Sequence, residues 1–154
     1  MYRRYTLSTV LINDTPPTTP GQVLPTIPPP PPRPWGYHGI FDCNKCDLAK
    51  IQDQTVISQW VAELSTTLNW TAISKIAIAV NGTLDANTAG FVVYQAFNNG
   101  SLSVHISDNN KQIYVDLFSY AEFDPIAVDN SLIKYFGDTV EVRKVLMPRN
   151  AAVG

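Results

Sequence analysis

The side chains that could do chemistry gather in one stretch, where a turn at residues 98–100 joins two strand-like runs. Ser101 directly follows this turn, and His105, one of only two histidines, lies four residues further on. Whether this junction does chemistry is therefore the first question about function. The other interpretation of His105 is a packed and hydrogen-bonded strand residue, since the adjacent Val104 and Ile106 point to the opposite face of a strand.

The cysteine pair Cys43-X-X-Cys46 is a second candidate site. A structural zinc site needs four ligands, and beyond these thiols the chain has only His38 and His105. A redox pair would sit at a strand-to-helix junction, but the neighbouring residues are negative or neutral and do not lower a thiol pKa. Those neighbours are Asp42, Asn44 and Asp47. Two reduced thiols at a strand end are the simplest interpretation, with redox or metal use left open.

The composition indicates a packed globular domain. Of 154 residues, 45% are hydrophobic and 16% are charged, which is too apolar for a disordered chain. A formal net charge of −2 gives no reason to expect nucleic acid or an anionic membrane as a partner. No apolar run reaches the roughly 18 residues that a membrane span needs. A convincing signal-peptide core is missing near the N-terminus, so we expect a protein that is not secreted.

Residues 1–34 differ in composition from the rest and are expected to be a proline-rich extended arm. Ten of the twelve prolines lie there, including the run Pro28, Pro29, Pro30, Pro31, Pro32. Because proline fixes φ and lacks a backbone donor, polyproline II is expected here instead of helix or central strand. The arm is either a flexible tether or a contact to another subunit or protein through these prolines.

The folded domain is expected at residues 35–154, around a β-meander. The meander runs are rich in Val, Ile, Phe and Tyr, and Asn, Asp and Gly turns separate them. These runs are 89–97, 101–107 and 112–120. Other strands are expected at 35–41, 73–80 and 139–147.

Two amphipathic helices complete the domain. The first begins near Asp53, an N-cap candidate. Its expected inward residues are Val56, Ile57, Trp60, Val61, Leu64 and Leu68. The second helix follows Asp124-Pro125 and ends at Gly137. Its expected inward residues are Ile126, Ile133 and Phe136, joined by Val128 or Leu132.

The element order β-α-β-β-β-β-α-β predicts an α+β fold, a two-layer sandwich of two helices on one face of a mostly antiparallel sheet. Such a sandwich leaves the other sheet face without cover. A homodimer or larger homo-oligomer is expected to supply that cover.

An ordered set of motifs carries a family resemblance. The set is Trp35-Gly-Tyr-His-Gly-Ile-Phe-Asp-Cys43, His105, Tyr114-Val-Asp-Leu-Phe-Ser119, Phe123-Asp-Pro125 and Tyr135-Phe-Gly137. It resembles the prokaryotic S-adenosylmethionine decarboxylases, and in particular short forms encoded by marine phages. The match covers about residues 35–148 and leaves the arm outside. The resemblance implies the same sandwich fold and a pyruvoyl-dependent decarboxylase of polyamine (spermidine) biosynthesis.

The resemblance also implies how such an enzyme makes its cofactor. In the family, a serine at the first meander turn, usually preceded by glutamate, attacks its own upstream carbonyl. The resulting ester breaks and leaves a pyruvoyl group, which serves as the electron sink for loss of CO₂. A serine in the preceding strand and a histidine in the following strand assist this processing, and a cysteine donates a proton during turnover.

Carried over residue by residue, the resemblance keeps only the processing histidine, as His105. The other four roles fall on Gly100 for the self-cleaving serine, Asn99 for its glutamate, Val92 for the assisting serine and Tyr120 for the cysteine. A glycine has no hydroxyl with which to attack. The chain is therefore expected to be a divergent member that lacks the self-cleaving serine.

Two functions follow. The first is a catalytically inactive, unprocessed module for structure, assembly or binding, with no cofactor, as a phage virion component or in the host cytoplasm. The alternative is an active decarboxylase of S-adenosylmethionine or an amino acid, self-cleaved at Gly100–Ser101, with Ser101 as precursor of the pyruvoyl group. A bulge would have to re-aim Ser101, because a one-residue slip turns a strand side chain to the opposite face. His105 and Tyr120 would then assist, and Asp116 is either structural or a substrate contact.

Overall fold

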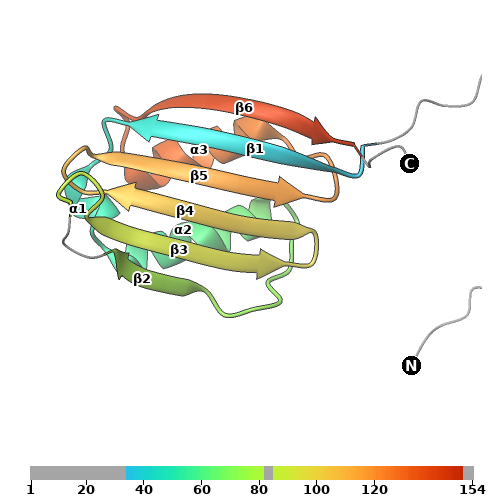
Figure 1. Ribbon diagram of the computed structural model, residues 1–154, viewed down its shortest axis with the longest axis horizontal. Helices are drawn as coiled ribbons and strands as arrows, with labels where there is room; N and C mark the ends of the chain where they lie inside the picture. Colours follow the sequence, from blue (N-terminus) through green and yellow to red (C-terminus); the bar gives the residue numbers. More distant parts are fainter. Residues whose placement is uncertain (1–33, 82–84, 151–154) are drawn as a thin grey trace, which may run out of the picture. The chain divides into compact units, whose positions relative to one another are not determined.

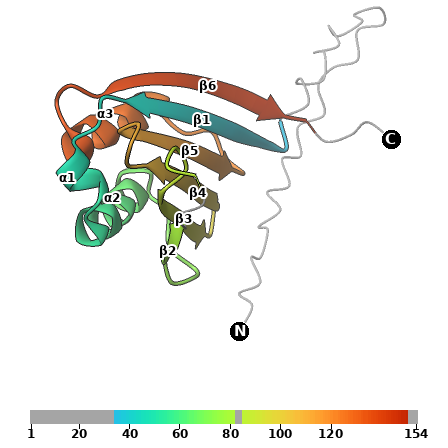
Figure 2. The same cartoon turned by 60° about the vertical axis from the view of Figure 1, so that its left-hand side comes forward.

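The computed structural model describes residues 34–81 and 85–150, and six strands in this part of the chain form one antiparallel sheet (Figure 1). The strands are β1 (Gly36–Asn44), β2 (Ala77–Asn81), β3 (Gly90–Phe97), β4 (Gly100–Ser107), β5 (Gln112–Ser119) and β6 (Glu141–Arg149). Their order in the sheet is β2-β3-β4-β5-β1-β6. The helices are α1 (Leu48–Ile51), α2 (Gln54–Thr67) and α3 (Pro125–Phe136), and α2 and α3 cover one face of the sheet (Figure 2). The predicted α+β two-layer sandwich is confirmed.

β2 begins at Ala77 and not at residue 73 as predicted. The backbone N–H of Ile73 still donates to the carbonyl of Ala96 in β3, at 3.0 Å. Ser74 then interrupts the pairing, because its hydroxyl accepts from the Ala96 N–H (3.2 Å) and its carbonyl accepts from the Gln95 side chain (2.6 Å). Side-chain hydrogen bonds thus replace the ladder here, and regular pairing starts only at Ala77.

α2 forms where the periodicity predicts it. The Asp53 carboxylate caps the helix by accepting from the backbone N–H of Thr55, at 2.7 Å. Four of the six expected inward residues are fully buried, and the other two, Val56 and Leu68, pack partly buried against the same core. The four are Ile57, Trp60, Val61 and Leu64. The sequence does not predict α1, because a single helical turn is too short to show a period.

α3 begins as predicted, with Asp124 accepting from the Ile126 N–H (2.8 Å) and Pro125 at the first helical position. One expected inward residue is wrong: Ile126 is 59% exposed. The buried residues follow a spacing of three or four, which places Ile126 off their stripe. They are Val128, Ser131, Leu132 and Phe136. Gly137 ends the helix with φ of 124°, a conformation that glycine adopts without strain.

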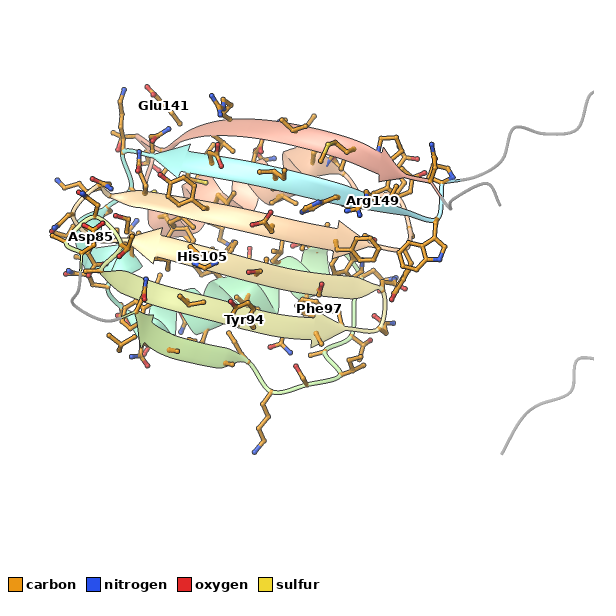
Figure 3. All side chains as sticks on the ribbon, viewed as in Figure 1. Asp85, Tyr94, Phe97, His105, Glu141 and Arg149 are labelled. Atoms are coloured by element: carbon orange, nitrogen blue, oxygen red, sulfur yellow. The ribbon has the colours of Figure 1, made fainter. Side chains whose placement is uncertain are left out.

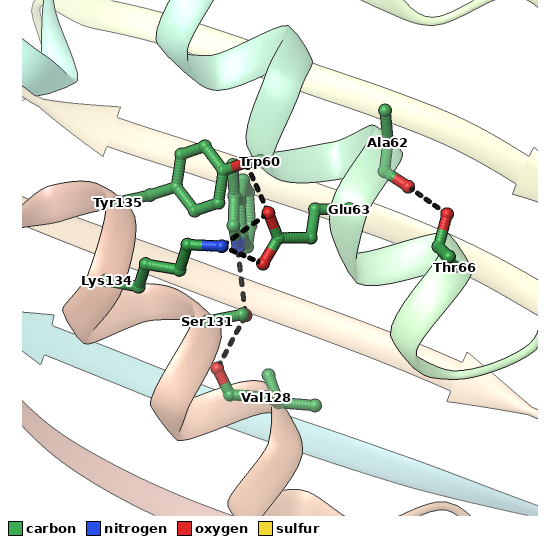
Figure 4. A network of polar contacts seen from close by, with 8 residues as sticks. All are labelled: Trp60, Ala62, Glu63, Thr66, Val128, Ser131, Lys134 and Tyr135. Carbon is green, nitrogen blue, oxygen red and sulfur yellow. Dashed lines mark hydrogen bonds and ion pairs between the residues drawn. The ribbon is translucent and has the colours of Figure 1, made fainter.

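A buried hydrogen bond and an outer polar cluster join α2 to α3 (Figure 4). The indole N–H of Trp60 donates to the Ser131 hydroxyl at 3.1 Å inside the core. Further out, Glu63 accepts from the Lys134 ammonium at 2.6 Å and from the Tyr135 hydroxyl at 2.7 Å. These hydrogen bonds, that from Lys134 above all, hold the pKa of Glu63 below its usual value. The pair of helices is therefore held together on both its buried and its exposed side.

The two cysteines belong to the hydrophobic core between sheet and helices. Cys43 lies in β1 and Cys46 just after it, and both are buried with free thiols. Burial raises the pKa of both thiols, that of Cys46 to about 11. A thiol that stays protonated is a poor nucleophile and a poor metal ligand, so this environment favours the structural interpretation of the pair.

We predict that the native protein hides its thiols from a disulfide reagent. With a pKa near 11, only about one thiol in a thousand is ionised at pH 8. Labelling with Ellman's reagent at pH 8 should therefore be slow in native buffer, while both thiols react at once in 6 M guanidinium. Rapid labelling of two thiols in the native state would contradict the placement of this pair in the core.

We predict that Ser131→Ala destabilises the fold by about 1–3 kcal/mol, because it leaves the buried Trp60 indole N–H without an acceptor. Urea unfolding followed by circular dichroism measures the change. Thr66→Ala is the matched control, since Thr66 is exposed and its hydroxyl likewise donates to a helix carbonyl, that of Ala62 (Figure 4). The control should change stability by less than about 0.5 kcal/mol. Equal effects of the two substitutions would refute the importance of the buried bond.

Candidate functional site

The sheet face opposite α2 and α3, which we call the open face, carries most of the candidate residues (Figure 3). Residues directly opposite each other in an antiparallel ladder share a face, so the register defines its members. Along the strand order they include Ala77, Ala79, Val92, Tyr94, Ala96, Ser101, Ser103, His105, Tyr114, Asp116, Phe118, His38, Ile40, Asp42, Arg143, Val145 and Met147. Several of these are large and apolar, and no helix of the described chain covers them.

Gly100 lies at the start of β4, beside the backbone of β5. It ends the tight turn Asn98-Asn99 that joins β3 to β4, and it pairs with Ser119. A Cβ atom at position 100 would lie 1.9 Å from the carbonyl oxygen of Phe118, which is far inside van der Waals contact. Only glycine therefore fits this position in the observed backbone.

Ser101 is exposed on the open face, in the ladder between Ala96 of β3 and Phe118 of β5. The register runs without interruption on both sides of β4, so no bulge re-aims this side chain. A shallow hollow of about 440 Å³ lies beside it, between β2, β3 and β4. Its lining includes Lys75, Tyr94 and Ser101.

His105 is exposed in the middle of β4, so the interpretation of a packed histidine is wrong. Val104 and Ile106 are indeed buried on the opposite face, as expected. The neighbours of His105 in the ladder are Val92 and Tyr114. Its ring borders a small cavity of about 190 Å³ near the start of β3. A small recess therefore borders the histidine that the resemblance keeps.

Asp116 has a protein partner on the open face. Its carboxylate lies 3.2 Å from Nε2 of His38, which is on the neighbouring strand β1. Ser103 and Ile40 lie directly opposite Asp116 on its two sides. The sequence indicates Asp116 as a candidate residue, whereas it suggests His38 only as a possible metal ligand. Their pairing depends on the register between β1 and β5, which local sequence patterns do not contain.

Tyr120 follows β5 at the end of the sheet where the Asn98-Asn99 turn lies. Its backbone N–H donates to the carbonyl of Asn99 at 2.8 Å. Its ring packs edge-on against Trp35 and Phe118, with centroid distances of 5.4 and 5.2 Å. The structure thus places Tyr120 close to the turn that includes Gly100, as part of an aromatic cluster.

The positions assigned by the resemblance fall into two separate groups. Asn99, Gly100 and Tyr120 meet at one end of the sheet, whereas Val92 and His105 face each other further along. Because a strand rises about 3.3 Å per residue, roughly 16 Å of β4 separates positions 100 and 105. The residues at these positions therefore lie in two places on the sheet.

Other predicted features stand as follows. The proline run Pro28–Pro32 lies outside the described residues. Within residues 34–81 and 85–150, no group of three or more His, Cys, Asp or Glu side chains could hold a metal ion. No helix in the same residues is long and apolar enough to cross a membrane.

Comparisons with known proteins agree with this architecture. Residues 37–149 match the family model described as S-adenosylmethionine decarboxylase. The solved structure of the adenosylmethionine decarboxylase from Aquifex aeolicus VF5 is similar with a TM-score of 0.60 and 17% identity, over 79% of this chain and 95% of that one. No curated protein matches the sequence. Because the family model spans most of the chain, the protein belongs to the S-adenosylmethionine decarboxylase family.

Proposed function

We propose that this protein is an unprocessed member of its family, which uses the sandwich as an assembly or binding module and not as a decarboxylase. The observation that carries the proposal is the environment of Gly100. The family's self-cleaving serine falls on this position, where the chain has no hydroxyl and where a Cβ would collide with the Phe118 carbonyl oxygen. Both the nucleophile and the space for it are missing.

Ser101 is a poor substitute for that nucleophile. Its side chain lies on the open face, whereas a side chain at position 100 would point to the other face, because neighbouring strand residues alternate. The uninterrupted register of β4 leaves no bulge that would re-aim Ser101 to the face of position 100.

The open face supports the assembly part of the proposal. Val145 is 49% exposed there, and Ile40 lies directly opposite it in the ladder. Tyr94, Tyr114 and Met147 add further exposed apolar area on the same face. Exposed apolar side chains that gather on one sheet face in this way favour a contact surface. We propose that a second copy of the chain covers it, which gives a homodimer with paired sheets.

We predict that the purified protein is a single polypeptide of 17.0 kDa. Intact mass spectrometry after denaturation measures this directly. Cleavage at Gly100–Ser101 would instead give fragments of 100 and 54 residues, since 154 − 100 = 54. A keto-capped fragment that begins at position 101 would refute the proposal.

The variant Gly100→Ser, in the same experiment, tests why the chain stays uncleaved. It distinguishes the lack of a hydroxyl from a backbone that has no space for one. We expect the variant to stay uncleaved and to lose on the order of 1–3 kcal/mol of stability, because the added atoms overlap with the β5 backbone. Cleavage of this variant would show that the backbone still permits processing.

We predict that Val145→Asp converts the homodimer to a monomer, because a carboxylate would be buried without a partner between two sheets. Sedimentation velocity distinguishes the 17.0 kDa monomer from a species of twice that mass. Ile126→Asp is the control, since Ile126 is also exposed and apolar but belongs to α3 in the helix layer. A monomeric wild-type protein at every concentration would exclude the paired sheets.

The enzyme hypothesis keeps one supporting observation. Ser101 shares the open face with His105 and Asp116 and borders a hollow of about 440 Å³. If the chain were processed at Ser101, substrate could reach that serine from this side. Release of CO₂ from carboxyl-labelled S-adenosylmethionine, lost in Ser101→Ala, would establish this function.

A further inference from the structure

Three aromatic rings form an exposed cluster at the end of the sheet, which we call the aromatic shelf: Trp35, Phe118 and Tyr120. Their ring centroids lie 5.2–5.5 Å apart, and the Tyr120 ring meets each of the other two edge-on. Trp35 is 58% exposed and Tyr120 is 55% exposed. The rings fix each other's positions and still present much of their surface to the outside.

The shelf has the chemistry of a binding surface. Within the shelf, the tip of the Phe118 ring packs closely against Gly36. A Cβ atom at position 36 would lie only 2.8 Å from it. Among the described residues, neither the Trp35 indole N–H nor the Tyr120 hydroxyl has a side-chain hydrogen-bond partner. Tryptophan and tyrosine with free polar groups on an exposed apolar surface are typical of interfaces. The shelf therefore offers flat apolar faces together with two available hydrogen-bond donors.

A polyproline segment matches both features. Its proline rings pack onto aromatic faces, and its carbonyls lack internal hydrogen bonds and can accept from indole and phenol donors. Little conformational entropy is lost on binding, because proline already fixes the backbone. This sequence carries such a segment, Pro28–Pro32, just before Trp35.

We propose that the aromatic shelf binds the Pro28–Pro32 run of a second copy of this chain. Within one copy, only Arg33 and Pro34 separate the run from Trp35. A segment rich in proline is stiff and extends about 3.1 Å per residue, which favours the shelf of another copy over the ring two residues further along the same chain. Exchange of arms between two copies would fill both shelves by the same contact, as a twofold dimer requires.

The binding of the proline run to the shelf adds a specific contact to the proposed homodimer. It rests on that proposed homodimer only because a second copy must supply the proline run. The shelf and the cleavage question are independent. The intact mass decides whether the chain is processed, whereas peptide binding decides whether the shelf is occupied. A failure of one proposal is thus distinguishable from a failure of the other.

The test uses the full-length protein and a synthetic peptide of residues 25–34, which contains no tryptophan or tyrosine. At concentrations where the protein is dissociated, the peptide should change the Trp35 fluorescence saturably. The variant Trp35→Phe measures the fluorescence of the buried Trp60 and Trp70 alone, which is subtracted. Tyr120→Ala should weaken peptide binding by at least about tenfold. Tyr94→Ala, a similarly exposed tyrosine away from the shelf, should change it by less than about twofold.

A dilution series decides which copy supplies the segment. For the wild-type protein, the Trp35 fluorescence should depend on protein concentration, and replacing Pro28–Pro32 by serines should abolish this dependence. No saturable peptide binding, or equal weakening by Tyr120→Ala and Tyr94→Ala, would overturn the shelf as a proline site. If the Trp35 fluorescence depends on the prolines but not on protein concentration, the proline run does not come from a second copy.

Discussion

The close approach of Gly100 to the Phe118 carbonyl is the constraint on which the functional interpretation depends. Because the β5 backbone occupies the space of a side chain at position 100, the first turn of the meander is tied to the neighbouring strand. Tyr120 strengthens this tie, since its N–H donates to the Asn99 carbonyl. Restoring a hydroxyl at position 100 would therefore require a movement of β5 and the residues after it, and not merely one added oxygen.

The two faces of the sheet differ in what they contribute. The helix face is filled by side chains such as Phe41, Val93 and Leu117, which are almost completely buried and supply most of the apolar area removed from water. The open face holds apolar side chains that the described chain leaves partly exposed, together with the His38–Asp116 pair. Folding of one chain thus accounts for the first face, whereas we propose that a second copy covers the second face.

Local patterns predict most of the fold and little of the site. The meander follows from alternating apolar residues and Asn, Asp and Gly turns, and the helix caps Asp53 and Asp124 are where the sequence indicates them. The start of β2 is wrong because hydrogen bonds of Ser74 compete with the ladder. Ile126 is misplaced because it lies off the buried stripe of α3, to which Val128 and Leu132 belong.

The site escapes prediction for a different reason. His38 and Asp116 are 78 residues apart, and the aromatic shelf joins Trp35 to Phe118 over a similar separation. Such contacts depend on how β1 registers against β5, which becomes known only when the whole sheet is assembled.

If the chain is unprocessed, as we propose, its fold can still persist. Processing in this family begins with a serine hydroxyl, and position 100, on which that serine falls, has neither a hydroxyl nor space for a side chain. Assembly needs only a stable sheet with apolar area on one face, and the buried core on the other face maintains that sheet. Substitutions such as valine at position 92, opposite His105, remove a polar group from the open face and add apolar contact area. Under our proposal, a change that removes a processing group also favours association, so a binding role can persist on the same scaffold.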